Sequence, residues 1–110
     1  MGDSREMFRS LRWPFEDGTF PADLGAVVQR TILDGTLPAL VVGHSPDGSW
    51  YVGDGVSDPN APGAVVATHI WHAIERNGSI AALAWLAPGH EARREGPGDP
   101  WRVERVDLEL

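Results

Sequence analysis

The sequence contains neither cysteine nor lysine. Without cysteine there can be no disulfide framework and no thiolate metal site, and without lysine there can be no Schiff-base lysine and no P-loop lysine. Apolar runs such as 39–43 and 80–87 are far shorter than the ~20 residues that cross a bilayer. The opening Met-Gly-Asp-Ser-Arg-Glu does not resemble a secretory signal. We therefore expect a cytoplasmic protein with no membrane partner.

Basic charge is scarce as well. The chain has 16 acidic residues against 9 basic ones, all of them arginine, and a formal net charge of -7. A surface of this sign offers no electrostatic footprint for a phosphate backbone, so we expect no nucleic-acid partner. It would suit a basic protein partner, whose association it would accelerate by long-range attraction.

A chain of 110 residues has the size of one domain. Residues 1–23 mix charge, proline and aromatic side chains, and we expect an N-terminal arm that is partly flexible and partly held by its aromatics. Residues 24–110 are expected to form a single α+β domain.

Hydrophobic patterning and turn residues predict the elements of that domain. Because only two helices are expected, they can cover one face of a sheet and leave the other for solvent or a partner. The fold class is therefore α+β, a small antiparallel sheet with one or two short helices packed on one face. The expected elements are strands at 26–32, 37–44 and 49–54, a loop at 54–63, a helical section from about 64 to 76, a second helix at 80–86, and a polar hairpin of 90–95 with 101–106.

A row of possible ligands lies in the helical section. His69, His72 and Glu75 recur at intervals of three residues, and imidazole and carboxylate are ordinary metal ligands. A further ligand would have to come from His44 or His90. In the simpler interpretation His69 caps the helix while His72 and Glu75 face water. We predict no metal and no cofactor, and keep the row as an alternative ligand site.

No pattern in the sequence is typical of nucleophilic catalysis, and we name no catalytic residue. His44 and Ser45 are neighbours in a predicted strand, so their side chains point to opposite faces.

The sequence has 5 tryptophans, which serve equally well as core and as interface anchors. Trp71 and Trp85 lie on predicted helices and are expected in the core. Trp13 and Trp101 lie in less regular segments and are the better candidates for an exposed aromatic surface.

Aspartates in the predicted loops are the candidate contacts for a basic partner. Asp47, Asp54 and Asp58 lie in glycine-rich turns, where they would be exposed. Together with Trp101 they form the predicted partner-binding set.

The order of these segments resembles a widespread group of small bacterial proteins. The resemblance is carried by residues 28–35, 37–43 and 47–50, then by 73–80, where the group has a "V-L-E-x-D-P-S-I" helix, and by the Pro-Gly step at 88–89. It spans about residues 26–106. Asn77-Gly78 departs from the Asp-Pro of the group.

That group, long described as a domain of unknown function, is now treated as immunity proteins of polymorphic toxin systems. The resemblance implies a binding protein that neutralises a toxin by occlusion, and it defines no catalytic residues. A non-catalytic protein-binding module of this type is our leading hypothesis. The alternative is a small enzyme, or a small-molecule or metal binder, that uses the row of His69, His72 and Glu75 in self-resistance or biosynthesis.

Overall fold

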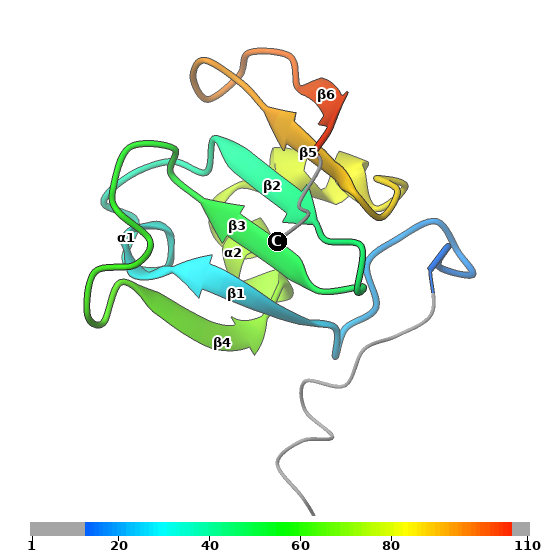
Figure 1. Ribbon diagram of the computed structural model, residues 1–110, viewed down its shortest axis with the longest axis horizontal. Coiled ribbons are helices and arrows are strands. Elements are labelled where there is room, and N and C mark those ends of the chain that lie inside the picture. The colour runs from blue at the N-terminus through cyan, green and yellow to red at the C-terminus, as the bar shows by residue number, and fades with distance from the viewer. Residues whose placement is uncertain (1–12, 107–110) are drawn as a thin grey trace, which may run out of the picture.

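The computed structural model describes residues 13–106 and shows a six-stranded sheet with three short helices (Figure 1). The strands lie in the order β4-β1-β3-β2-β5-β6. The expected mixture of helix and strand is confirmed. The elements are β1 (Gly25–Gln29), α1 (Arg30–Leu33), β2 (Val41–His44), β3 (Trp50–Gly53), β4 (Val65–His69), α2 (Trp71–Arg76), the 3-10 helix η2 (Gly78–Leu83), β5 (His90–Arg93) and β6 (Arg102–Arg105).

The sheet is mixed, so the expectation of an antiparallel sheet is confirmed only in part. β1 and β3 run parallel, with Val27 opposite Tyr51, while every other neighbouring pair is antiparallel. A tight turn between Ser45 and Ser49 reverses the chain from β2 into β3. Because β3 then inserts between β1 and β2, it meets β1 in the same direction.

The expected helical section begins with a strand. Residues 65–69 form β4, whose five residues all pair with β1, and the ladder is extended at both ends by hydrogen bonds from Arg30 to Ala64 and from Ile70 to Leu24. The β-branched residues at 65 and 66 favour this conformation. Helix α2 starts only at Trp71, and the helix cap expected from His69 is not formed.

Two other elements differ from expectation near the helices. The strand expected over 26–32 ends at Gln29, and the chain turns into α1, which buries Ile32. The second helix is a 3-10 helix at 78–83 rather than an α-helix at 80–86. By contrast, the polar hairpin is confirmed as β5 paired with β6.

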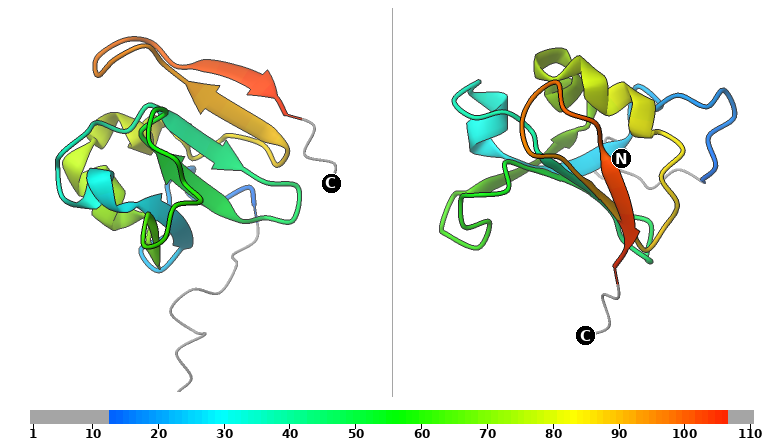
Figure 2. Two further views of the ribbon diagram at one scale, coloured as in Figure 1. Left: turned by 60° about the vertical axis from the view of Figure 1, so that its left-hand side comes forward. Right: turned by 90° about the horizontal axis from the view of Figure 1, so that it is seen from above.

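All three helices lie on one side of the sheet, as the right-hand view of Figure 2 shows. None of the helices within residues 13–106 is long and apolar enough to cross a membrane. Because the helices lie on one side of the sheet, the core lies between the sheet and the layer formed by α2, η2 and their flanking turns. Its main members are Ala26, Val28, Val42, Trp50, Val52 and Ala92 from the sheet, and Ile70, Ala73, Ile74, Ile80, Leu83 and Leu86 from the helical layer.

The described part of the N-terminal arm belongs to this core. Phe15 and Phe20 are buried, with ring centroids 6.0 and 5.0 Å from that of Trp50. On its other side Trp50 stacks on His44, with centroids 3.9 Å apart. Trp50 thus joins the arm to β2 and β3. The remainder of the arm, residues 1–12, lies outside the described residues, as do 107–110.

Replacing Trp50 should be far more costly than replacing the exposed Trp85. Trp50→Ala should lower the free energy of unfolding by about 3–5 kcal/mol, because it removes the largest buried side chain and leaves a cavity. Trp85→Ala should change the free energy of unfolding by less than about 0.5 kcal/mol. Urea unfolding followed by circular dichroism measures both, and similar losses in the two variants would contradict this description of the core.

Candidate functional site

The face of the sheet opposite the helices is the part of the molecule left open. Side chains alternate along β3, so Trp50 and Val52 are buried in the core while Tyr51 lies on the open face. Val27 on β1 is registered with Tyr51 and is 38% exposed. No helix among residues 13–106 covers this face (Figure 1).

One row of registered residues crosses the open face from edge to edge. Each neighbour in the row is a direct cross-strand partner of the next, so the side chains share one face. The row changes from apolar on β4 and β1, through an aromatic ring on β3, to acidic on β5 and β6. We call it the central row: Ala67, Val27, Tyr51, Gly43, Glu91 and Glu104.

Tyr51 does not stand upright in this row. Its ring lies along β3 over Gly53, where any side chain would overlap the Tyr51 hydroxyl. Burial raises the pKa of the Tyr51 phenol, and the negative charge of Asp54 adds to the effect. The phenol is therefore neutral at pH 7, and its ring forms a flat wall beside Gly53.

A hollow lies beside that wall, over Gly43. Its volume is about 300 Å³ and its lining is mostly apolar. Tyr51 flanks it on β3, Glu91 on β5, and Val106 lies at the end of β6. The hollow thus opens in the central row, between the aromatic and the acidic positions.

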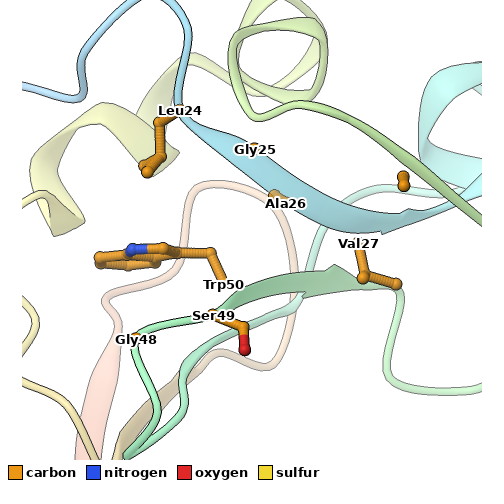
Figure 3. A pocket seen from close by; sticks show the side chains of 8 residues that line it. Leu24, Gly25, Ala26, Val27, Gly48, Ser49 and Trp50 are labelled. Atoms are coloured by element: carbon orange, nitrogen blue, oxygen red, sulfur yellow. The ribbon is translucent and has the colours of Figure 1, made fainter. Parts of the chain in front are cut away.

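A second, smaller hollow of about 160 Å³ lies on the other side of β3 (Figure 3). It opens where β1 and β3 begin, before their parallel pairing is established at Val27. Val27, Ala67 and Ser49 contribute to its lining, together with the edge of Trp50. This hollow carries no charged side chain.

Charged residues dominate the β5–β6 end of the face. Arg93 pairs with Glu91 at 3.3 Å, and Arg102 pairs with Glu95 at 3.3 Å. The cross-strand register nevertheless places like charges opposite each other, Glu91 against Glu104 and Arg93 against Arg102. Like charges in direct opposition destabilise a sheet, and the ion pairs of Glu91, Arg93 and Arg102 offset this repulsion only in part.

The three aspartates of the predicted partner-binding set do not form one surface. Asp47 is exposed in the turn before β3, where its carboxylate accepts hydrogen bonds from Ser49. Asp58 is exposed in the loop after β3, at the opposite end of that strand. Asp54 is only 1% exposed, so its expected exposure is wrong and it offers nothing to a partner.

Asp54 organises the loop after β3 instead. Its carboxylate accepts hydrogen bonds from the Thr31 hydroxyl at 2.7 Å and from the amides of Val56 and Ser57 at 2.8 and 2.7 Å. Burial opposes the charge, but these hydrogen bonds outweigh it and lower the pKa of Asp54. The Gln29 side chain completes the network, accepting from the Asp54 amide.

Trp101, the fourth member of the set, is half-buried rather than presented to solvent. Its ring lies under the guanidinium of Arg94 at 4.3 Å, and its indole N–H donates to the Ser79 carbonyl. Trp13 is held similarly, by a hydrogen bond to the Ala84 carbonyl. Both indoles pack against the helical layer, so the structure shows core packing, the alternative for these two residues, rather than an exposed aromatic surface.

The exposed tryptophans are those expected in the core. Trp85 is 60% exposed, and Trp71 is 36% exposed although its indole donates to the Phe20 carbonyl. The short helices turn these two positions away from the sheet.

The histidine row is brought together only in part. The rings of His69 and His72 are nearly parallel, with centroids 6.1 Å apart, and His72 Nδ1 lies 3.9 Å from Glu75 Oε1. His44 and His90 lie on β2 and β5, away from β4, and neither joins the row. Within residues 13–106 no three histidine or carboxylate side chains form a group that could hold a metal ion.

Two buried polar side chains were not anticipated as structural elements. Arg94 donates three hydrogen bonds, two to the Ala39 carbonyl and one to the Ser79 hydroxyl. His44 Nδ1 lies 2.7 Å from the Leu86 carbonyl oxygen and must donate to it, so this nitrogen carries the proton of the neutral ring. Nothing in their sequence neighbourhoods indicates these partners, which are 15 to 55 residues distant.

No protein-family model matches the chain, and no curated protein or solved structure matches it either. The immunity interpretation therefore stays a prediction.

Replacing Asp54 should lower the free energy of unfolding far more than replacing Asp58. Asp54→Ala should lower the free energy of unfolding by about 3 kcal/mol, because the buried donors that now bond to the Asp54 carboxylate lose their acceptor. Asp58→Ala, which removes an exposed bond to one amide, should cost less than about 1 kcal/mol. Urea unfolding gives both values, and hydrogen exchange should accelerate at residues 55–57 only in Asp54→Ala. Equal losses would exclude the structural role of Asp54.

His44 should make stability depend on pH. Burial lowers the pKa of its imidazole, outweighing the Leu86 hydrogen bond and the charge of Asp47, while His90 adds to the lowering. The unfolded chain then binds the proton more readily, so the free energy of unfolding should fall as the pH drops below about 6.5. Urea unfolding between pH 7.5 and pH 5 measures the slope.

In the variant His44→Asn the side-chain amide takes the place of Nδ1 as the donor. Its free energy of unfolding should be lower than that of the wild type at neutral pH but should change less with pH. His72→Asn, which changes an exposed imidazole on α2, serves as the matched control and should retain the wild-type slope. An unchanged slope in His44→Asn would show that another group carries the pH dependence.

Proposed function

We propose that this chain is a non-catalytic protein-binding module of the immunity type, which neutralises a toxin by occluding it through the open face of its sheet. The observation that carries the proposal is the central row, whose side chains grade from apolar to acidic across all six strands and are left uncovered by the helical layer. The sequence resemblance supports the same interpretation independently.

The dimensions of the face suit a protein partner. With neighbouring strands about 4.8 Å apart, the six strands span about 24 Å from β4 to β6. A standard interface buries about 800 Å² on each partner, and a face of this width with its flanking loops can supply most of that area. The hollows over Gly43 and beside Val27, of about 300 and 160 Å³, are large enough to receive single side chains of a partner.

Two of the side chains with perturbed pKa values, His44 and Asp54, are engaged by hydrogen bonds within the fold and are 2% and 1% exposed. His44 is held by a backbone carbonyl, and Asp54 by a hydroxyl and two amides. A general acid or base must have reach to a substrate, and these groups have none. The row of His69, His72 and Glu75 runs from the edge strand β4 into α2 and, within residues 13–106, is not part of a group that could hold a metal ion, so the alternative of a metal site has less support.

Charge points to a basic toxin. The chain carries a net charge of -7, and Asp47, Glu91 and Glu104 lie on or beside the open face, where Arg93 and Arg102 offset part of the acidic charge. Such a surface accelerates encounter with a cationic partner and disfavours acidic ones.

The test is protection of growing cells. Expression of the toxin encoded beside this chain should arrest growth, and co-expression of the chain should restore it. Val27→Gln, which places an amide in the apolar part of the central row, should weaken binding of the purified proteins at least about tenfold. Trp85→Ala, exposed on the helical side, is the matched control and should bind normally.

The association rate should also fall at least about tenfold between 50 mM and 500 mM salt, because steering is screened. Binding that is insensitive to Val27→Gln would move the contact to another surface. Failure of the chain to restore growth or to bind any neighbouring toxin would exclude the immunity function.

A further inference from the structure

Among residues 13–106 no contact accounts for the hollow over Gly43. Gly43 lies inside β2 with no positive φ, so its backbone does not require glycine. A Cβ built there meets nothing within 4 Å, so no neighbour requires glycine either. Gly53 on the adjacent strand differs, because the Tyr51 ring fills the space above it. Glycine weakens a strand and often marks a place where an external group approaches.

The walls of the hollow define the chemistry of that group. Tyr51 offers an aromatic face, Val106 an apolar side and Glu91 a carboxylate whose side chain is 22% exposed and which Arg93 already pairs at 3.3 Å. The remaining lining comes from His44, Ser45 and His90. Glu104 faces Glu91 directly across the β5–β6 pair and has no ion pair within residues 13–106. Because Arg93 offsets the charge of Glu91 but not that of Glu104, a further positive charge between the two carboxylates would still be favourable.

A guanidinium group meets all three requirements. It is planar and stacks on aromatic rings, it binds carboxylates in a bidentate manner, and its aliphatic stem tolerates apolar walls. The protein already uses this arrangement internally, where Arg94 stacks on Trp101.

We propose that the hollow over Gly43 is a socket for an arginine side chain of the protein partner. The proposal rests on the proposed function and sharpens it, because it assigns an anchor residue to the partner. Arginine buried in a pocket is among the commonest energetic anchors of protein interfaces. The acidic end of the central row then binds the guanidinium, while the apolar end and the second hollow receive uncharged side chains.

The experiment uses the isolated chain and a small probe. N-acetyl-arginine amide is titrated into the isotope-labelled protein and followed by amide chemical shifts, with N-acetyl-citrulline amide as the uncharged isostere. Saturable shifts should centre on Gly43, Tyr51 and Glu91, and the citrulline compound should bind at least about tenfold more weakly.

Two variants test the walls. Gly43→Val should fold normally, because the added side chain enters open space in a strand that favours β-branched residues. It should abolish the arginine-dependent shifts. Glu91→Gln should weaken binding at least about fivefold. Glu95→Gln, the same change just beyond β5 and outside the hollow, is the matched control and should bind as the wild type does. Melting curves establish that each variant is folded.

Several outcomes would overturn the proposal. Equal affinity for arginine and citrulline, or undiminished binding by Gly43→Val, would show that the hollow does not recognise a guanidinium. Shifts at Gly43 that depend on protein concentration would assign the hollow to a second copy. Shifts there on removal of residues 107–110 would assign it to the end of this chain.

The same variants separate this inference from the proposed function. If Gly43→Val protects cells as well as the wild type, the immunity function stands and the arginine socket is wrong. If the wild type binds the arginine probe at the hollow but protects against no toxin, the socket stands and the immunity function is wrong.

Discussion

The strict alternation of side chains along β3 is the constraint on which both halves of this molecule depend. Trp50 and Val52 point to the helical layer and Tyr51 to the open face, and no shift in register could satisfy both. Trp50 then gathers the described part of the arm and the buried His44 around it. The strands that pair with β3 alternate in register with it, so one face of the sheet belongs to the core and the other is a surface.

That division separates stability from binding. Buried polar side chains such as Asp54 and Arg94 form hydrogen bonds that hold the loops and the helical layer in place. The open face holds the features that folding does not explain, a glycine with empty space above it and like charges set opposite each other. Proteins retain such locally unfavourable arrangements where a function requires them, and this contrast directs attention to the sheet rather than to the histidines.

Local patterns were informative where the determining contacts were local. The turn at Pro46-Asp47-Gly48 predicts the β2–β3 hairpin, and the polar segments around 90–95 and 101–106 predict the β5–β6 hairpin. Prediction failed at 65–69, which the sequence analysis includes in the helical section but which pairing with β1 makes a strand. It failed again for the tryptophans, because the burial of Trp101 depends on Arg94 and Ser79 and not on its own surroundings in the chain.

The sequence by itself determined the α+β class, an acidic surface and the presence of too few helices to cover two faces of a sheet, since these follow from composition and local propensity. Only the tertiary structure decided that β1 and β3 run parallel, that Asp54 is buried and that Tyr51, Gly43 and Glu91 form one row. These features arise from pairing between strands that are distant in the chain. The free energy of such pairing depends on which faces are buried together, and no single segment carries that information.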